Sequence, residues 1–104
     1  MKTNLMPDNS YKHSHICEEL HDIYVKKNSD YGDSFSNTFH KLGVISAVTR
    51  ISDKCERLIT LSRTKNHIGK VSDESMRDTL LDLANYCIMT IMELDGEKVE
   101  GVLE

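Results

Sequence analysis

The segment over residues 73–92 most constrains the fold, because acidic side chains recur at helical spacing inside a stretch that is otherwise apolar. Glu74, Asp78 and Asp82 repeat every four residues. Asn85 follows three residues later, so a helix would carry all of these polar groups along one stripe. The other positions are apolar almost all the way round, as in a buried helix: Leu80, Leu81, Leu83, Ala84, Cys87, Ile88, Ile91 and Met92. A carboxylate on a buried helix is costly unless it is paired, protonated or bound to a metal ion, so Asp78 and Asp82 are the first candidates for a functional role.

Hydrophobic periodicity predicts an all-α fold, a helical bundle of three main helices. The first helix is expected from about residue 13 to 27, the second from about 42 to 63, and the third from 72 or 73 to just before Gly96. Polar residues 28–33 are expected to form a first loop, and residues 64–71 connect the two long helices. No β-alternating run or internal repeat competes with this interpretation.

The size and charge of the chain limit the classes of partner that it is expected to bind. We expect one domain over residues 1–104, with flexible ends over 1–12 and 97–104. Three main helices provide too few neighbours to cover an apolar helix on every side, which favours a homodimer or a higher homo-oligomer. The formal net charge of -4 argues against direct nucleic-acid binding. No apolar run is long enough to span a bilayer and the start lacks the apolar stretch of a signal peptide, so we expect a cytoplasmic protein without a membrane partner.

The three cysteines, Cys17, Cys55 and Cys87, are far apart in the sequence and form no Cys-x-x-Cys pair. A zinc site would need closer grouping. Each lies among apolar residues at helical spacing, so we expect three buried thiols.

The predicted second helix carries complementary charges. Three cations and one acid are three and four residues apart and share a face: Arg50, Asp53, Lys54 and Arg57. Taken alone, this pattern is typical of a solvated surface with internal ion pairs. If the two long helices pack antiparallel, however, acids from both could converge on a hard divalent cation such as Mg²⁺. The candidate metal ligands are Asp53, Glu56, Glu74, Asp78 and Asp82, and the candidate phosphate ligands are Arg50, Lys54 and Arg57.

The first predicted loop supplies candidate contacts to a nucleobase. Tyr31 and Phe35 lie close to Gly32, which permits tight backbone geometry, and aromatic faces stack on bases. The alternative is that both aromatics plug the end of the helical core. The candidate base or ribose contacts are Tyr31, Asp33, Phe35 and Asn85.

Three blocks of the sequence carry a family resemblance: YGDSF over 31–35, RISDKCERL over 50–58 and ESMRDTLLDLANY over 74–86. In this order they resemble the signature blocks of the small nucleotide modification associated domain family, which is common in phages. That family is considered similar to the all-α MazG-like nucleotide pyrophosphohydrolases, in which helices pack as dimers or tetramers and acids on two helices hold Mg²⁺ beside a triphosphate. The resemblance implies a helical, dimeric, nucleotide-handling domain with the acid cluster named above, acting in the bacterial host cytosol if phage-encoded.

One part of the pyrophosphohydrolase pattern is missing. MazG-like enzymes carry a Glu-Glu-x-x-Glu group on the earlier helix, whereas this chain has Asp53 and Glu56, with Arg57 where another acid would fall. Fewer acids leave fewer ligands for a metal that would activate water and screen the phosphates.

Two functions from different classes therefore stay open. The first is a Mg²⁺-dependent hydrolase that cleaves a nucleoside triphosphate between its α and β phosphates. The five acidic residues named above would act as metal ligands or general base, and Glu56 and Asp78 are the candidate catalytic residues. The second is a non-catalytic phage protein that sequesters a nucleotide or a nucleotide-derived immune signal, an anti-defence role. A structural helical adaptor is a third alternative, in which removing the acids would be neutral or stabilising.

Overall fold

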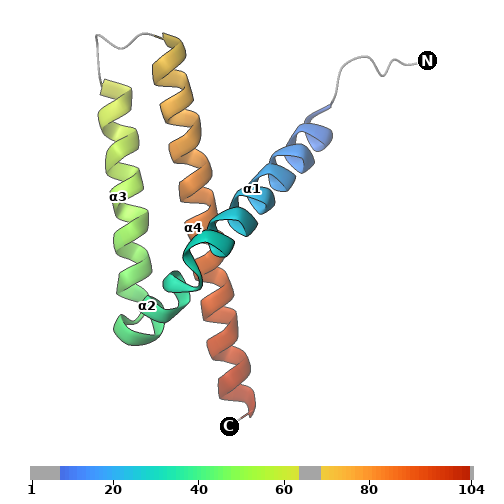
Figure 1. Cartoon of the computed structure of the whole chain (residues 1–104), viewed down its shortest axis with the longest axis vertical. Helices are drawn as coiled ribbons and strands as arrows, with labels where there is room; N and C mark the ends of the chain where they lie inside the picture. Colours follow the sequence, from blue (N-terminus) through green and yellow to red (C-terminus); the bar gives the residue numbers. More distant parts are fainter. Residues whose placement is uncertain (1–7, 64–68, 104) are drawn as a thin grey trace, which may run out of the picture. The chain divides into compact units, whose positions relative to one another are not determined.

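The computed structural model describes residues 8–63 and 69–103, without the side chains of residues 31, 69–73 and 97–103. This part of the chain is helical, with no strand among the described residues, which confirms the predicted all-α class. Four helices follow one another, as Figure 1 shows: α1 (Asn9–Tyr31), α2 (Ser34–Leu42), α3 (Val44–Arg63) and α4 (Gly69–Leu103). None of them, over the described residues, combines the length and apolar character needed to cross a membrane.

Helix α1 is longer than predicted at both ends. It begins after Asp8, whose side chain caps the helix by accepting a hydrogen bond from the backbone N–H of Tyr11 at 2.9 Å. It continues through residues 28–31, which we predicted as loop, because polar residues disfavour a helix without forbidding it. The first strong stop is Gly32, with a φ of 71°, whose N–H donates to the carbonyl of Asn28.

Helix α2 was not predicted at all. Its nine residues make about two and a half turns, too few for periodicity to identify the helix. Phe35 and Phe39 are four residues apart and therefore lie on one side of it, where both are buried. Gly43, with a φ of 83°, ends α2, and α3 begins at the next residue, two positions after the predicted start.

Helix α4 also exceeds its prediction. It begins at Gly69, inside the segment predicted as a connection, and runs through Gly96, where we predicted its end. A glycine inside a helix costs about 1 kcal/mol relative to alanine, which a long helix tolerates. The predicted flexible ends fall partly outside the description, since residues 1–7 and 104 are not described, whereas residues 97–103 continue the helical backbone.

The chain divides into two compact units, Met1–Gly32 and Asp33–Glu104. The first contains α1 and the second contains the other three helices. In the second unit α3 packs along α4, and α2 contacts both of them. The buried centre of this unit consists of Phe35, Phe39 and Ala47, with Tyr86 and Met89 packed against it.

Much of the apolar surface of α4 is exposed, which corrects the prediction of a buried helix. Leu80 is 49 % exposed and Ile91 56 % exposed, and Ile88, Met92 and Leu94 are exposed as well. The reason is that α3 covers one side of α4, so an all-round apolar helix keeps uncovered faces. The prediction of three buried thiols is also wrong, since Cys17, Cys55 and Cys87 are all exposed.

Candidate functional site

Helices α3 and α4 meet in an antiparallel register that contacts between their side chains define. Arg57 contacts Thr79, Lys54 contacts Asp82 and Arg50 contacts Tyr86. Steps of three and four residues back along α3 thus match steps of three and four residues forward along α4, as antiparallel helices require. We call these six residues the α3–α4 seam.

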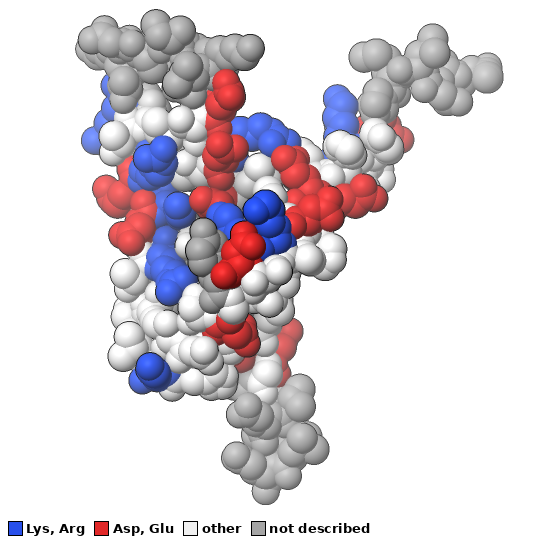
Figure 2. Space-filling model, in the orientation of Figure 1, with Lys and Arg blue, Asp and Glu red and all other residues white. Residues whose placement is uncertain are grey.

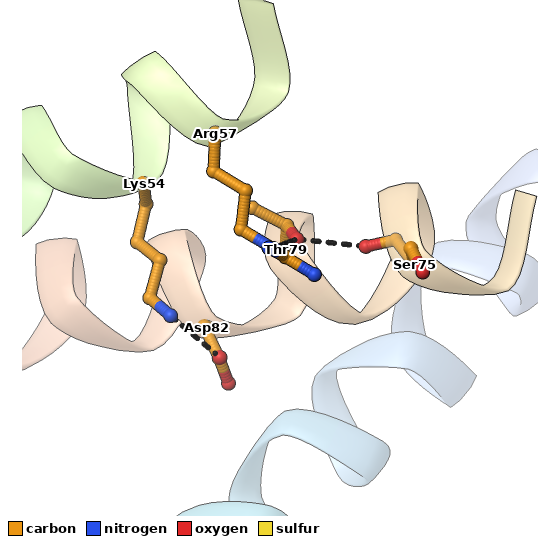
Figure 3. A network of polar contacts seen from close by, with 5 residues as sticks. All are labelled: Lys54, Arg57, Ser75, Thr79 and Asp82. Atoms are coloured by element: carbon orange, nitrogen blue, oxygen red, sulfur yellow. Dashed lines mark hydrogen bonds and ion pairs between the residues drawn. The ribbon is translucent and has the colours of Figure 1, made fainter. Parts of the chain in front are cut away.

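The centre of the seam is an ion pair. The Lys54 ammonium lies 3.2 Å from a carboxylate oxygen of Asp82, and their side chains are 26 % and 28 % exposed. Figure 3 shows the pair bridging the two helices. A candidate phosphate ligand and a candidate metal ligand therefore neutralise each other, and a ligand of either one would have to compete with this ion pair.

Arg57 is held one turn away by a buried hydroxyl. Its Nε donates to Oγ1 of Thr79 at 3.1 Å, and that hydroxyl donates in turn to the carbonyl of Ser75 at 2.7 Å (Figure 3). Thr79 is only 3 % exposed. Because its single proton is committed to Ser75, the Thr79 oxygen acts as an acceptor toward Arg57, which keeps its two terminal nitrogens as further donors.

Arg50 is the third cation of α3 in the seam, and it lies against two aromatic rings. Its Cζ atom lies 5.5 Å from the ring centroid of Phe35 and 5.9 Å from that of Tyr86. The two rings stack with centroids 6.0 Å apart and planes 17° apart. The charge therefore lies against ring faces, the arrangement of a cation–π interaction.

The candidate acids are distributed unevenly around the seam. Asp82 is part of it, whereas the others are exposed: Asp53, Glu56, Glu74 and Asp78. Helical spacing sets Asp53 and Glu56 on one flank of α3, and sets Glu74, Asp78 and Asn85 on the flank of α4 on the same side, because the helices run antiparallel. Figure 2 shows basic side chains over α3 with acidic side chains to either side of them.

The described residues include no group of three or more His, Cys, Asp or Glu side chains placed to hold a metal ion. Their carboxylates offer the oxygen donors that Mg²⁺ prefers. The arrangement of these residues, with Asp82 on Lys54 and the other four acids at the surface, does not assemble them into a set of ligands. The metal assignment stays a prediction.

The four candidate base or ribose contacts have different surroundings. Phe35 is 7 % exposed and belongs to the core, where it stacks on Tyr86. Asp33 is exposed at the start of α2, where its side chain makes no capping hydrogen bond, and Asn85 is half-buried on α4. The side chain of Tyr31 lies outside the described residues.

Sequence patterns did not identify Thr79, whose hydroxyl links Arg57 to the backbone carbonyl of Ser75. Thr79 lies three residues before Asp82 and Ser75 lies seven before it, so both are on the face of α4 that carries Asp82. A threonine three residues before an acid, on one face of an otherwise apolar helix, is the sequence signal that could have indicated a cross-helix partner. Tyr86 also belongs to this face, four residues after Asp82.

A protein family model described as Nucleotide modification associated domain 1 matches residues 27–94. The match includes α2, α3 and every residue of the α3–α4 seam. No curated protein and no solved structure matches the chain. The matched range covers well over half of the 104 residues and contains all three sequence blocks described above. The chain therefore belongs to the Nucleotide modification associated domain 1 family.

Proposed function

We propose that this protein binds a nucleoside phosphate along the α3–α4 seam. The observation that supports the proposal is the row of three cations on α3, Arg50, Lys54 and Arg57, which face α4 within the range matched by the family model. The family description names nucleotides, and phosphate oxygens are the part of a nucleotide that a row of cations recognises.

The surroundings of the row are suited to an anion in spite of the net charge of the chain. Arg57 keeps terminal donors beyond its bond to Thr79, and two donors of one guanidinium can hold one phosphate group. Lys54 and Asp82 cancel each other, so the two arginines supply the positive charge of the seam. Tyr31, Asp33 and Asn85 stay the proposed contacts to base or ribose, whereas buried Phe35 would act through Arg50.

Hydrolysis is a second candidate, favoured by the acidic flank. Asp53 and Glu56 of α3 lie on the same side of the helix pair as Glu74 and Asp78 of α4. This fits the proposal of Mg²⁺ as cofactor and of Glu56 and Asp78 as catalytic residues, acting as metal ligands or general base. The arrangement in this structure does not gather those acids around one point, so no step of the reaction is assigned to the metal. Of the two candidate functions, nucleotide binding without hydrolysis is the one that this arrangement supports better.

We further propose a relationship to the MazG-like nucleotide pyrophosphohydrolases and a role in phage nucleotide metabolism, in the cytoplasm of the bacterial host. The order of the three sequence blocks and the all-helical structure support the relationship. The non-catalytic form of this proposal is a phage protein that sequesters a nucleotide or a nucleotide-derived immune signal.

We propose that the chain forms a homodimer or a higher homo-oligomer through its second unit. In the described part of this unit only four apolar residues are buried: Phe35, Phe39, Ala47 and Leu81. Nine large apolar residues of α3 and α4 are exposed: Val44, Ile45, Val48, Ile59, Leu80, Ile88, Ile91, Met92 and Leu94. If a second copy covered part of this surface, each Å² of apolar area removed from water would contribute about 25 cal/mol of favourable free energy.

The proposal is tested by a thermal-shift screen of nucleoside mono-, di- and triphosphates, each with and without Mg²⁺. A ligand that binds the folded protein raises its melting temperature by mass action. The best ligand is then incubated with the protein and analysed by chromatography. Return of the intact nucleotide indicates a binder, and release of a monophosphate and pyrophosphate indicates the hydrolase.

Two double variants with the same loss of charge test whether any shift in melting temperature depends on the seam. Arg50 and Arg57 are both replaced by methionine in the test variant, and Lys12 and Lys26 of α1 are both replaced by methionine in the control, so that each variant loses two positive charges. We expect the first to abolish the nucleotide-dependent shift and the second to retain it. Loss of the shift in both, or in neither, would contradict binding at the seam.

A further inference from the structure

The three cations of the seam differ in how far their charge is already engaged. Lys54 is paired with the carboxylate of Asp82, and the Nε of Arg57 is bonded to Thr79. For Arg50, within the described residues, the structure records ring contacts and neither an ion pair nor a hydrogen bond of its guanidinium. Arg50 is half-buried, so this charge is partly withdrawn from water, and no carboxylate among the described residues forms an ion pair with it.

The rings of Phe35 and Tyr86 explain how the charge is tolerated. Their mutual distance of 6.0 Å and their distances of 5.5 and 5.9 Å to the Cζ of Arg50 form a nearly equilateral triangle. A ring attracts a cation through its face and uses none of the N–H donors of the guanidinium. The five donors thus stay available while the rings restrict the orientation of the group.

The two rings come from different helices and are themselves fixed. Phe35 belongs to α2 and is 7 % exposed, and Tyr86 belongs to α4 and packs against the same buried cluster. A turn of either ring would disrupt its packing in this cluster. A guanidinium oriented before the ligand arrives loses less conformational entropy on binding.

We propose that Arg50 is the principal anion-binding side chain of the seam and that Phe35 and Tyr86 are its positioning residues. The inference rests on the proposed function and deepens it by ranking the cations. Arg50 takes a phosphate group through two N–H donors, Arg57 adds its terminal nitrogens, and the Lys54–Asp82 pair contributes little net charge. Aromatic side chains at this end of the seam therefore serve the phosphate and not the base.

The ranking is tested by calorimetric titration of the full chain with inorganic pyrophosphate at low salt. We expect Arg50→Met to weaken pyrophosphate binding about tenfold or more, and Arg57→Met about threefold, although each removes one positive charge. The paired change Lys54→Met with Asp82→Asn removes both charges of the ion pair and should alter the affinity by less than about twofold. Helix content and melting temperature establish that each variant is folded.

The positioning role is tested at Tyr86, with one variant that keeps the ring and one that removes it. Tyr86→Phe should bind pyrophosphate as the wild type does, whereas Tyr86→Leu, which keeps apolar bulk, should bind about fivefold more weakly. Adding Tyr86→Leu to Arg50→Met should cause no further loss, because the ring acts through Arg50. A loss of stability alone would not produce this lack of additivity.

The outcomes separate the ranking from the function on which it rests. If the wild type binds neither pyrophosphate nor any nucleotide, both the proposed function and the ranking are overturned. If it binds but Arg50→Met weakens binding no more than Arg57→Met, the proposed function stands and the ranking is overturned. Full additivity of Tyr86→Leu with Arg50→Met would overturn the positioning role.

Discussion

Breaking the Lys54–Asp82 ion pair should destabilise the second unit by an amount that a double-mutant cycle can measure. The two charged atoms are 3.2 Å apart, which corresponds to an attraction of about 1 kcal/mol in bulk water and about 5 kcal/mol at an effective dielectric constant of 20. Side-chain exposure of 26 % and 28 % places the pair between these limits, and desolvation offsets part of the gain. We therefore expect a coupling energy of about 1 kcal/mol.

The cycle consists of the wild type, Lys54→Met, Asp82→Asn and the double variant, each unfolded in urea at low and at high salt. A difference of about 1 kcal/mol corresponds to a change of roughly 4–8 °C in melting temperature for a domain of this size. The pair Lys26–Asp30 on α1 is a matched control, because its atoms are 3.3 Å apart while its side chains are 80 % and 50 % exposed. Its coupling should be about 0.3 kcal/mol and should disappear at high salt.

The comparison of the two cycles decides whether the register of α3 on α4 is correct. A coupling energy for Lys54 and Asp82 no larger than that of the exposed control would refute the reasoning. So would a Lys54→Met variant as stable as the wild type, since the partly buried Asp82 carboxylate would lose its ion pair with Lys54.

Two further outcomes follow from the packing of the second unit. Phe39 is 2 % exposed, so Phe39→Ala should lower the free energy of unfolding, measured in urea, by about 3 kcal/mol. The control Tyr11→Ala replaces a side chain that is 58 % exposed and should change this free energy by less than about 0.5 kcal/mol. Equal losses in the two variants would contradict the placement of the core. Ile91 is 56 % exposed on α4, so Ile91→Glu should lower the mass measured by sedimentation from that of an oligomer to that of a monomer. An unchanged mass would exclude this face of α4 from the proposed interface between copies.

Helices α3 and α4 were predictable because each has enough turns for its pattern to repeat. Three-and-four spacing identified Arg50, Lys54 and Arg57 as one face of α3, and the antiparallel packing on which the charge argument depended is present. The boundaries were less well predicted. Helix α2 is too short to repeat a pattern, and polar residues 28–31 continue α1 up to Gly32, where a positive φ ends it.

Which partner each seam residue meets could not be predicted, because it depends on the register between helices. Periodicity fixes the face of a helix and leaves its sliding along the neighbour undetermined. The structure pairs Lys54 with Asp82, which separates two residues that the sequence argument assigned to phosphate and metal. It also buries Phe35 under Arg50, which supports the alternative in which this aromatic residue packs in the core.

The exposed apolar surface has a similar cause. The sequence pattern of α4 indicates burial of most of its circumference, and burial is a property of everything that surrounds a helix. One chain provides α3 and α2 as neighbours in this unit, which leaves Leu80, Ile91 and Cys87 exposed. The pattern is consistent with a surface that a second copy covers.

Binding at the seam is tested most directly by nuclear magnetic resonance of the isotope-labelled chain during titration with a nucleoside triphosphate, with and without Mg²⁺. We predict that the largest shift changes occur at the side-chain Nε–H groups of Arg50 and Arg57 and at backbone amides over residues 50–57 and 79–86. Saturable shift changes that cluster on α1 instead, with α3 and α4 unaffected, would contradict it, as would the absence of any change at millimolar nucleotide.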